Sequence, residues 1–231
     1  MNIFEKYRGK LQRSLSGRGI FNTISLIFSK SMHRFQFRKY DFWGLIETSE
    51  LDGSEELKKH AVKYEASNQI FFKKLLDNVE WQFETSTLVD FGCGKGAALI
   101  YATEFGFKKV IGVEFSHNLS QLASDNLKKF SVQKGGKVSY EIVNIDASQY
   151  EIPSEADCFY FFNPFDAFIM EKVFQNIVKS LEANPRKILI VYLNAVYKEV
   201  IENCGFKRLK YLSKDELDYY FYNGGCVYTN E

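Results

Sequence analysis

The sequence predicts an α/β fold organised around a mostly parallel β-sheet. Short apolar runs alternate with stretches of helical periodicity along residues 88–212, which is the pattern of strands joined by crossover helices. The first run leads directly into three glycines and a helix, as in nucleotide-binding α/β domains. The last two runs, 207–212 and 221–229, have no helix between them long enough for a parallel crossover. They are therefore expected to form an antiparallel hairpin.

Seven apolar runs are predicted to be strands, and five segments are predicted to be helices. The strands are expected at residues 88–91, 110–115, 138–145, 158–162, 187–193, 207–212 and 221–229. The helices are expected at residues 57–76, 97–105, 116–130, 168–181 and 195–204. Three helices are preceded by a residue whose side-chain oxygen can accept from the first backbone N–H groups, namely Ser54, Ser116 and Asp166.

The glycines at 92, 94 and 96 form a tight turn after the first strand. Glycine suits such a turn because the backbone reverses sharply and approaches a ligand closely, which a Cβ atom would obstruct. The free N–H groups at the helix start then face that ligand. Glu114 ends the second strand 22 residues after Gly92, close to the spacing of about 20 residues at which a carboxylate holds ribose hydroxyls. A nucleoside is therefore expected across the ends of the first two strands.

This turn resembles the first motif of the class I S-adenosylmethionine-dependent methyltransferases. The motif reads (V/L)-(D/E)-x-G-x-G-x-G, and five residues match it: Val89, Asp90, Gly92, Gly94 and Gly96. The resemblance implies a Rossmann-like seven-stranded sheet and S-adenosylmethionine as cofactor. It also implies that the glycine loop passes the methionine part and that Glu114, followed by Phe115, holds the ribose. A structural glycine turn in an unrelated α/β domain is the alternative.

Two further elements are similar to a bacterial group of these methyltransferases. Tyr64 and Ser67 match a Tyr-x-Pro-(Ser/Thr) element that borders the cofactor there, with Ala66 in place of the proline. Asp146, followed by Ala147, ends the third strand, where an acid of the resembled family accepts from the adenine amino group. A solvent-facing loop aspartate is the alternative for Asp146. The cofactor-binding residues predicted in this way are Tyr64, Asp90, Gly92, Gly94, Gly96, Glu114, Phe115, Asp146, Ala147 and Asn163.

The fourth strand ends in Asn163, Pro164 and Phe165, at the sheet edge where ligands of open α/β folds bind. The Asn163 amide oxygen can accept from a substrate N–H, and the Pro164 carbonyl is expected to be free to point the same way. Phe165 can stack on a planar group or a methylated cation. A hydroxyl acceptor would need a base or metal that no nearby residue plainly supplies. These three residues are the predicted catalytic residues, with nitrogen as the acceptor atom; an ordinary turn is the alternative.

The Asn-Pro-Phe ending also resembles the bacterial group, which is similar to the catalytic domain of the non-SET histone-lysine methyltransferase. The resemblance covers residues 64–194. It implies the cofactor and the reaction, and leaves the methyl acceptor open. Asp166 is the nearest carboxylate in sequence to this motif, and capping the following helix is the expected role of its side chain.

The composition is that of a folded, reduced protein. Hydrophobic residues make up 45% of the chain and there are only three prolines, which argues against disorder. The four cysteines show no C-x-x-C spacing, so a cytoplasmic protein is expected in preference to a disulfide scaffold or zinc site, and no metal is predicted.

Residues 1–40 form a separate unit of charge. They hold nine Lys or Arg against Glu5, a net charge of +8, whereas residues 41–231 carry −7. The predicted domains are a basic helical arm at 1–47 and a methyltransferase domain at 48–231. The arm is read either as an interfacial helix on anionic lipid, which would make the protein peripheral at the membrane, or as a helix folded back on the domain. Base stacking on nucleic acid by residues 35–43 is disfavoured by the acidic remainder.

Together these features predict a methyltransferase that acts on a nitrogen of a small molecule or a protein side chain. The alternative is a non-catalytic nucleoside-binding fold that acts at a membrane surface or binds a partner. A NAD-dependent oxidoreductase agrees less well, because the glycine spacing is G-x-G-x-G rather than G-x-G-x-x-G.

Overall fold

The computed structural model describes residues 31–32, 34–217 and 222–231. The chain divides into two compact units, Met1–Tyr40 and Asp41–Glu231. All strands of the described residues belong to the second unit. Within the described part of the chain, no helix is long and apolar enough to cross a membrane.

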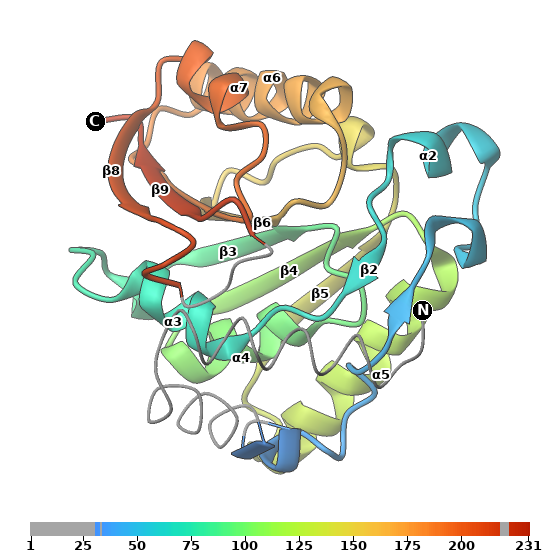
Figure 1. The fold of residues 1–231 in the computed structure, drawn as a ribbon. Helices are drawn as coiled ribbons and strands as arrows, with labels where there is room; N and C mark the ends of the chain where they lie inside the picture. The colour runs from blue at the N-terminus through green and yellow to red at the C-terminus, as the bar shows by residue number, and fades with distance from the viewer. Residues whose placement is uncertain (1–30, 33, 218–221) are drawn as a thin grey trace. The chain divides into compact units, whose positions relative to one another are not determined.

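A seven-stranded sheet forms the centre of the second unit, in the order β5-β4-β3-β6-β7-β9-β8 (Figure 1). Its strands are β3 (Thr87–Phe91), β4 (Lys109–Glu114), β5 (Ser139–Asn144), β6 (Ala156–Phe162), β7 (Leu189–Leu193), β8 (Lys207–Leu212) and β9 (Gly225–Thr229). The first five pair in parallel, while β9 is antiparallel to both β7 and β8. The predicted α/β class, Rossmann-like sheet and terminal hairpin are confirmed.

Helices cover both faces of the sheet (Figure 1). One face carries α3 (Gln69–Leu76), α4 (Ala97–Phe105) and α5 (His117–Gln133), and the other carries α6 (Ala167–Ala183) and α7 (Lys198–Asn203). Every residue of β3 is buried, because a central parallel strand packs on both faces. Between the sheet and α6, the Phe161 ring stacks on Phe91 with centroids 5.1 Å apart and on Phe174 of α6 with centroids 5.3 Å apart.

The predicted helix starts are confirmed. Ser116 Oγ accepts from Leu119 N at 3.2 Å at the start of α5, and Asp166 Oδ1 accepts from Ile169 N at 3.2 Å at the start of α6. Ser54 Oγ accepts from Leu57 N at 3.3 Å at the start of α2 (Glu55–His60). These caps satisfy backbone N–H groups that lack a partner inside the helix.

The single helix predicted at 57–76 is wrong. The chain leaves α2 at His60, forms the short strand β2 (Tyr64–Glu65) against β1 (Leu45–Ile46), and starts α3 only after Asn68. Ala61 instead makes an antiparallel bridge to Phe165, and Val62 N donates to the Pro164 carbonyl at 3.0 Å. These long-range backbone bonds replace the i→i−4 bonds that would have continued the helix. Three short 3₁₀ helices, Thr48–Glu50, Phe83–Thr85 and Ala147–Gln149, complete the described elements of this unit.

Candidate functional site

The glycine turn after β3 is crowded by two side chains of the protein itself. A Cβ on Gly92 would lie 2.4 Å from Pro164 Cβ, and a Cβ on Gly94 would lie 2.3 Å from the ring of Tyr64. Both glycines also have positive φ, 71° and 53°, which other residues rarely adopt. The sequence argument expected a ligand to require these glycines. Packing inside the protein already requires them.

Gly96 has a different role from the other two glycines. It is the N-cap of α4 with φ 80°, and a Cβ there would lie 2.9 Å from Leu127 Cδ2 of α5. It does not line the pocket described below. Gly96 therefore allows α4 and α5 to pack closely, which is the helix-packing role of a glycine in such a turn.

One pocket brings together the remaining predicted site residues. It lies at the carboxyl ends of β3, β4 and β6, and segment 60–67 also lines it. The predicted residues that line it are Tyr64, Asp90, Gly92, Gly94, Glu114, Phe115, Asp146, Ala147, Asn163, Pro164 and Phe165. Residues spread over a hundred positions therefore meet at the edge where open α/β sheets bind ligands.

Glu114 is held at the end of β4 by the backbone. It is 5% exposed, and its carboxylate accepts from Gly94 N at 2.9 Å and from Ser116 N at 3.0 Å. Burial raises the pKa of Glu114 to about 7, against the lowering effect of these backbone hydrogen bonds. The acid thus joins the glycine turn to the start of α5 and keeps acceptor capacity on the pocket side.

Asp90 lies deeper in the same pocket and is 3% exposed. Within the described part of the chain its carboxyl group receives no hydrogen bond, and burial and the nearby Glu114 raise its pKa well above the usual range. A buried acid without a donor is costly, so this position fits a ligand that brings a donor or a cation. S-adenosylmethionine has an α-ammonium group for Asp90 and ribose hydroxyls for Glu114. The residues present therefore fit the cofactor that the sequence predicts.

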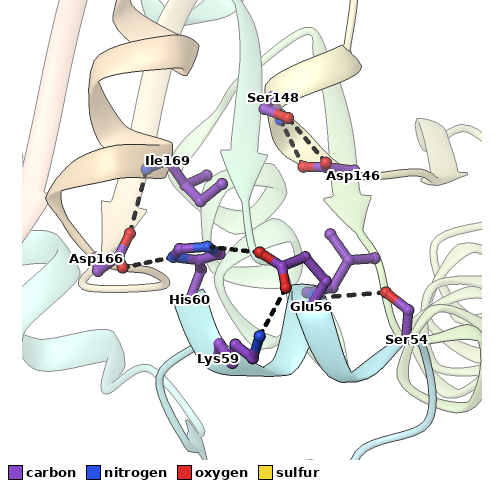
Figure 2. Close-up of polar contacts among 9 residues, drawn as sticks. Ser54, Glu56, Lys59, His60, Asp146, Ser148, Asp166 and Ile169 are labelled. Atoms are coloured by element: carbon purple, nitrogen blue, oxygen red, sulfur yellow. Dashed lines mark hydrogen bonds and ion pairs between the residues drawn. The ribbon is translucent and has the colours of Figure 1, made fainter.

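Asp146 makes local contacts from the pocket wall. Its Oδ1 accepts from Ser148 N at 2.8 Å and its Oδ2 from Ser148 Oγ at 2.8 Å, as Figure 2 shows. The carboxylate caps the 3₁₀ helix that begins at Ala147. Each oxygen has a second lone pair, so the cap leaves acceptor capacity for a ligand.

The Tyr64 ring packs against the glycine turn. It lies against Gly94, and its hydroxyl donates to the Phe42 carbonyl at 2.7 Å. Lys95 lies 5.6 Å from the ring centroid and forms an ion pair with Asp41 at 3.0 Å. Tyr64 is therefore held in place against the turn, and the residues around β2 line one side of the pocket.

The corner after β6 differs from its sequence-based description. Asn163 has a positive φ of 42°, and its Oδ1 accepts from the Tyr192 hydroxyl at 3.3 Å. The Pro164 carbonyl was expected to be free, but it accepts from Val62 N. The Phe165 ring is 7% exposed and packs edge-on against Phe161 with centroids 6.4 Å apart. Of the three residues, Asn163 is the one whose polar side chain remains at the pocket surface.

Sequence reasoning missed His60. Its Nδ1 lies 2.7 Å from Asp166 Oδ2, its Nε2 lies 3.6 Å from Glu56, and the residue lines the same pocket (Figure 2). The hydrogen bond to Asp166 raises the pKa of His60 above its usual value. The two residues are 106 positions apart, so no local spacing could have revealed the pair. The sequence argument found no plain base near this corner, whereas the folded chain brings the His60 imidazole to the same pocket.

Comparison with known proteins agrees with this geometry. A family model described as a methyltransferase domain matches residues 60–207, and the chain belongs to that family. No curated protein matches the chain. The pyocyanin biosynthetic protein PhzM is 16% identical, with a TM-score of 0.51, over 70% of this chain and 54% of that one.

Other solved structures are similar at lower scores. An RNA methyltransferase from Salinibacter ruber in complex with S-adenosyl-L-homocysteine is 18% identical, with a TM-score of 0.48, over 71% of this chain and 92% of that one. A SAM dependent methyltransferase from Aquifex aeolicus is 15% identical, with a TM-score of 0.49, over 71% of this chain and 100% of that one. The chain spans only 54% and 56% of two StiE O-MT structures. By family, the chain is therefore a methyltransferase domain.

Proposed function

We propose that the chain transfers the methyl group of S-adenosylmethionine to a nitrogen atom of an acceptor that enters beside Asn163. The observation that carries this proposal is Asn163 itself, a half-buried pocket residue with a left-handed backbone. A left-handed residue other than glycine costs on the order of 1 kcal/mol and persists where the surroundings enforce it, often at functional sites. Its amide oxygen keeps one lone pair beyond the Tyr192 contact, which suits an N–H group.

The cofactor is assigned to the β3-β4 side of the pocket. Glu114 accepts from the ribose hydroxyls and Asp90 faces the α-ammonium group, while Asp146 and Tyr64 border the remaining surface. When bound, S-adenosylmethionine supplies a methyl group that is already activated by the sulfonium charge. The protein then has to align the acceptor with the methyl carbon and exclude water.

The charge of the pocket favours an amine over an anionic acceptor. Its lining contains Glu65 and Asp146 against Lys63, apart from Asp90 and Glu114, whose pKa values are raised by burial and which are assigned to the cofactor. Two further acids, Glu56 and Asp166, flank His60, which lines the pocket (Figure 2). A cleft with an excess of one charge attracts ligands of the opposite sign. A cationic amine that loses a proton in the site is therefore the acceptor class that we propose.

A hydroxyl acceptor is the second candidate, and His60 is the observation that favours it. A histidine hydrogen-bonded to a carboxylate can serve as a general base for an alcohol or a phenol as well as for an ammonium group. The acidic lining gives no comparable support to a neutral acceptor, so nitrogen stays the first candidate.

The position of the transferred methyl group decides between these candidates. The purified chain would be incubated with S-adenosylmethionine labelled on the methyl carbon and with a panel of primary amines, secondary amines, amides, alcohols and phenols. Mass spectrometry would then locate the label. We expect it on nitrogen, and a product labelled on oxygen would overturn the proposal.

A further inference from the structure

We propose that His60 is the base that takes the proton from the acceptor nitrogen, and that Asp166 positions its imidazole. This inference rests on the proposed N-methyl transfer and adds the proton path to it. Asn163 cannot fill this role, because an amide is not a useful base at neutral pH.

The hydrogen bond to Asp166 fixes the tautomer of His60. A carboxylate only accepts hydrogen bonds, so His60 Nδ1, 2.7 Å from Asp166 Oδ2, carries the hydrogen. In the neutral imidazole the lone pair is therefore on Nε2. The closest carboxylate oxygen to Nε2 is Glu56 Oε1 at 3.6 Å, too long for a hydrogen bond. Nε2 is the nitrogen that can receive a proton.

Backbone and side-chain contacts hold His60 next to the corner where the acceptor is proposed to enter. The His60 carbonyl accepts from Asp166 N at 2.9 Å, next to the Ala61–Phe165 bridge. The Phe168 ring stacks on the imidazole with centroids 5.0 Å apart and planes at 30°. Asp166 is itself fixed, because its second oxygen caps α6 through Ile169 N. A catalytic base needs such fixed orientation toward its proton donor.

The groups around the ring favour proton uptake. Asp166 and Glu56 face the imidazole and stabilise its cation, and Lys59 balances part of the Glu56 charge through an ion pair at 2.8 Å. Lys172 Nζ lies over the Phe168 ring, 4.1 Å from its centroid. The net effect raises the pKa of His60, with the hydrogen bond to Asp166 as the largest cause. A base whose pKa lies near the working pH is the most effective kind.

The proton and electron balance of the step is as follows. The N–H proton of the acceptor moves to His60 Nε2, and the nitrogen electron pair forms the bond to the methyl carbon. The electron pair of the broken carbon–sulfur bond stays on sulfur. The imidazolium then releases its proton to water through its partly exposed edge, since 25% of the His60 side chain is accessible.

The proposed role of His60 can be tested by ligand binding, without an identified acceptor. S-adenosylhomocysteine has no group at the methyl position, whereas sinefungin carries an amine there that is cationic from pH 5.5 to 8.5. Calorimetry would give the ratio of their dissociation constants across this range. Titration of Glu114 or Asp90 affects the cofactor moiety common to both ligands, so it largely cancels in the ratio. Protonated His60 repels the amine of sinefungin. As the pH rises through the His60 pKa, the affinity for sinefungin relative to S-adenosylhomocysteine should therefore increase on the order of tenfold.

Variants distinguish a role of His60 as a base from a purely structural role. In His60→Gln, the ratio of dissociation constants should no longer change with pH. In Asp166→Asn, which can still cap α6, the change in this ratio should occur at lower pH. His117→Gln is the matched control, because His117 lies on α5 and outside the pocket, and it should keep the wild-type step. A flat ratio in the wild type, or an unchanged step in His60→Gln, would overturn the inference while the proposed function stands. If neither ligand binds the wild type, the cofactor site and the inference fail together.

Discussion

At the scale of single residues, two buried acids line the side of the pocket that we propose for the cofactor. Glu114 receives two backbone N–H groups, whereas Asp90 receives none from the described residues. Replacing Glu114 by Ala removes the proposed ribose acceptor and leaves Gly94 N and Ser116 N without a partner. Binding of S-adenosylmethionine should weaken by about 1.5 to 3 kcal/mol, the scale of hydrogen bonds to a charged group.

Calorimetry on the folded variant measures this loss. Glu141→Ala is the control, since Glu141 is a carboxylate of the neighbouring strand β5 outside the pocket. Equal affinity in the wild type and in folded Glu114→Ala would show that this acid does not hold the ribose.

The pKa of Glu114 adds a pH dependence to the same contact. Burial raises this pKa to about 7, and only the ionised carboxylate accepts from both ribose hydroxyls without competing as a donor. Ionisation is favoured as the pH rises, so cofactor affinity should rise through neutrality. With a pKa of about 7, linkage gives affinity about tenfold weaker at pH 6 than at pH 8. Glu114→Gln should lose this step in a calorimetric pH series, and an equal step in that variant would assign it to another group.

Asn163 carries the chemical prediction at the acceptor end. Asn163→Ala removes the proposed contact to the acceptor N–H, which strengthens as the nitrogen becomes positive. We expect kcat to fall about 10²-fold with little change in cofactor affinity, because the group acts in the transition state. The measurement is steady-state kinetics with the acceptor that the labelled panel selects.

Asn194→Ala is the matched control for Asn163→Ala. Asn194 also has a positive φ, 54°, but it lies outside the pocket, so its replacement carries similar backbone strain without the chemistry. Full turnover by Asn163→Ala would mean that this corner is only a turn.

At the scale of elements, the β1-β2 segment and the glycine turn depend on each other. Tyr64 occupies the space beside Gly94, so Gly94→Val forces the ring away and strains a backbone with φ 53°. Binding of S-adenosylmethionine should be lost in a domain that still folds. Circular dichroism and calorimetry on the same preparation test both parts.

A substitution at a second glycine, Gly136, distinguishes the effect of backbone strain from the effect of the clash with Tyr64. Gly136→Val introduces a side chain at φ 74°, where nothing lies within 4 Å, and it should keep cofactor binding. If Gly94→Val binds as well as Gly136→Val, the Tyr64 contact does not shape the site.

At the scale of the whole molecule, the charge is divided between two units. Residues 1–40 carry +8 and the remainder carries −7, and the boundary between the compact units falls at Tyr40. The apolar stretch at 20–28 lies outside the described residues, and contact with anionic lipid is one of the two interpretations of the arm that contains it. If the arm lies on an anionic membrane surface, deleting residues 1–40 should abolish binding to liposomes that contain anionic lipid and leave cofactor affinity unchanged.

Liposome sedimentation at low and high salt measures this prediction. Neutral liposomes provide the control, because attraction to a charged surface requires the anionic lipid. Aggregation of the shortened chain would instead show that the arm covers apolar surface of the domain, which is the alternative reading of the same residues.

The sequence by itself determined the sheet, its hairpin, the helix starts at Ser116 and Asp166, and the acids and glycines that line one pocket. These features depend on local signals: apolar periodicity, glycines at a turn, and capping side chains. Nine of the ten predicted cofactor-binding residues, several of them implied by the family resemblance, line that pocket, whereas Gly96 packs beside Leu127 of another helix and does not line it.

Tertiary structure alone decided what happens between residues 57 and 76. The helical pattern there is interrupted because Ala61 and Val62 pair with Phe165 and Pro164, backbone partners about a hundred positions away. That pairing also uses the Pro164 carbonyl and brings His60 to Asp166. Local patterns cannot encode such contacts, because their energies depend on which distant segments the folded sheet places side by side.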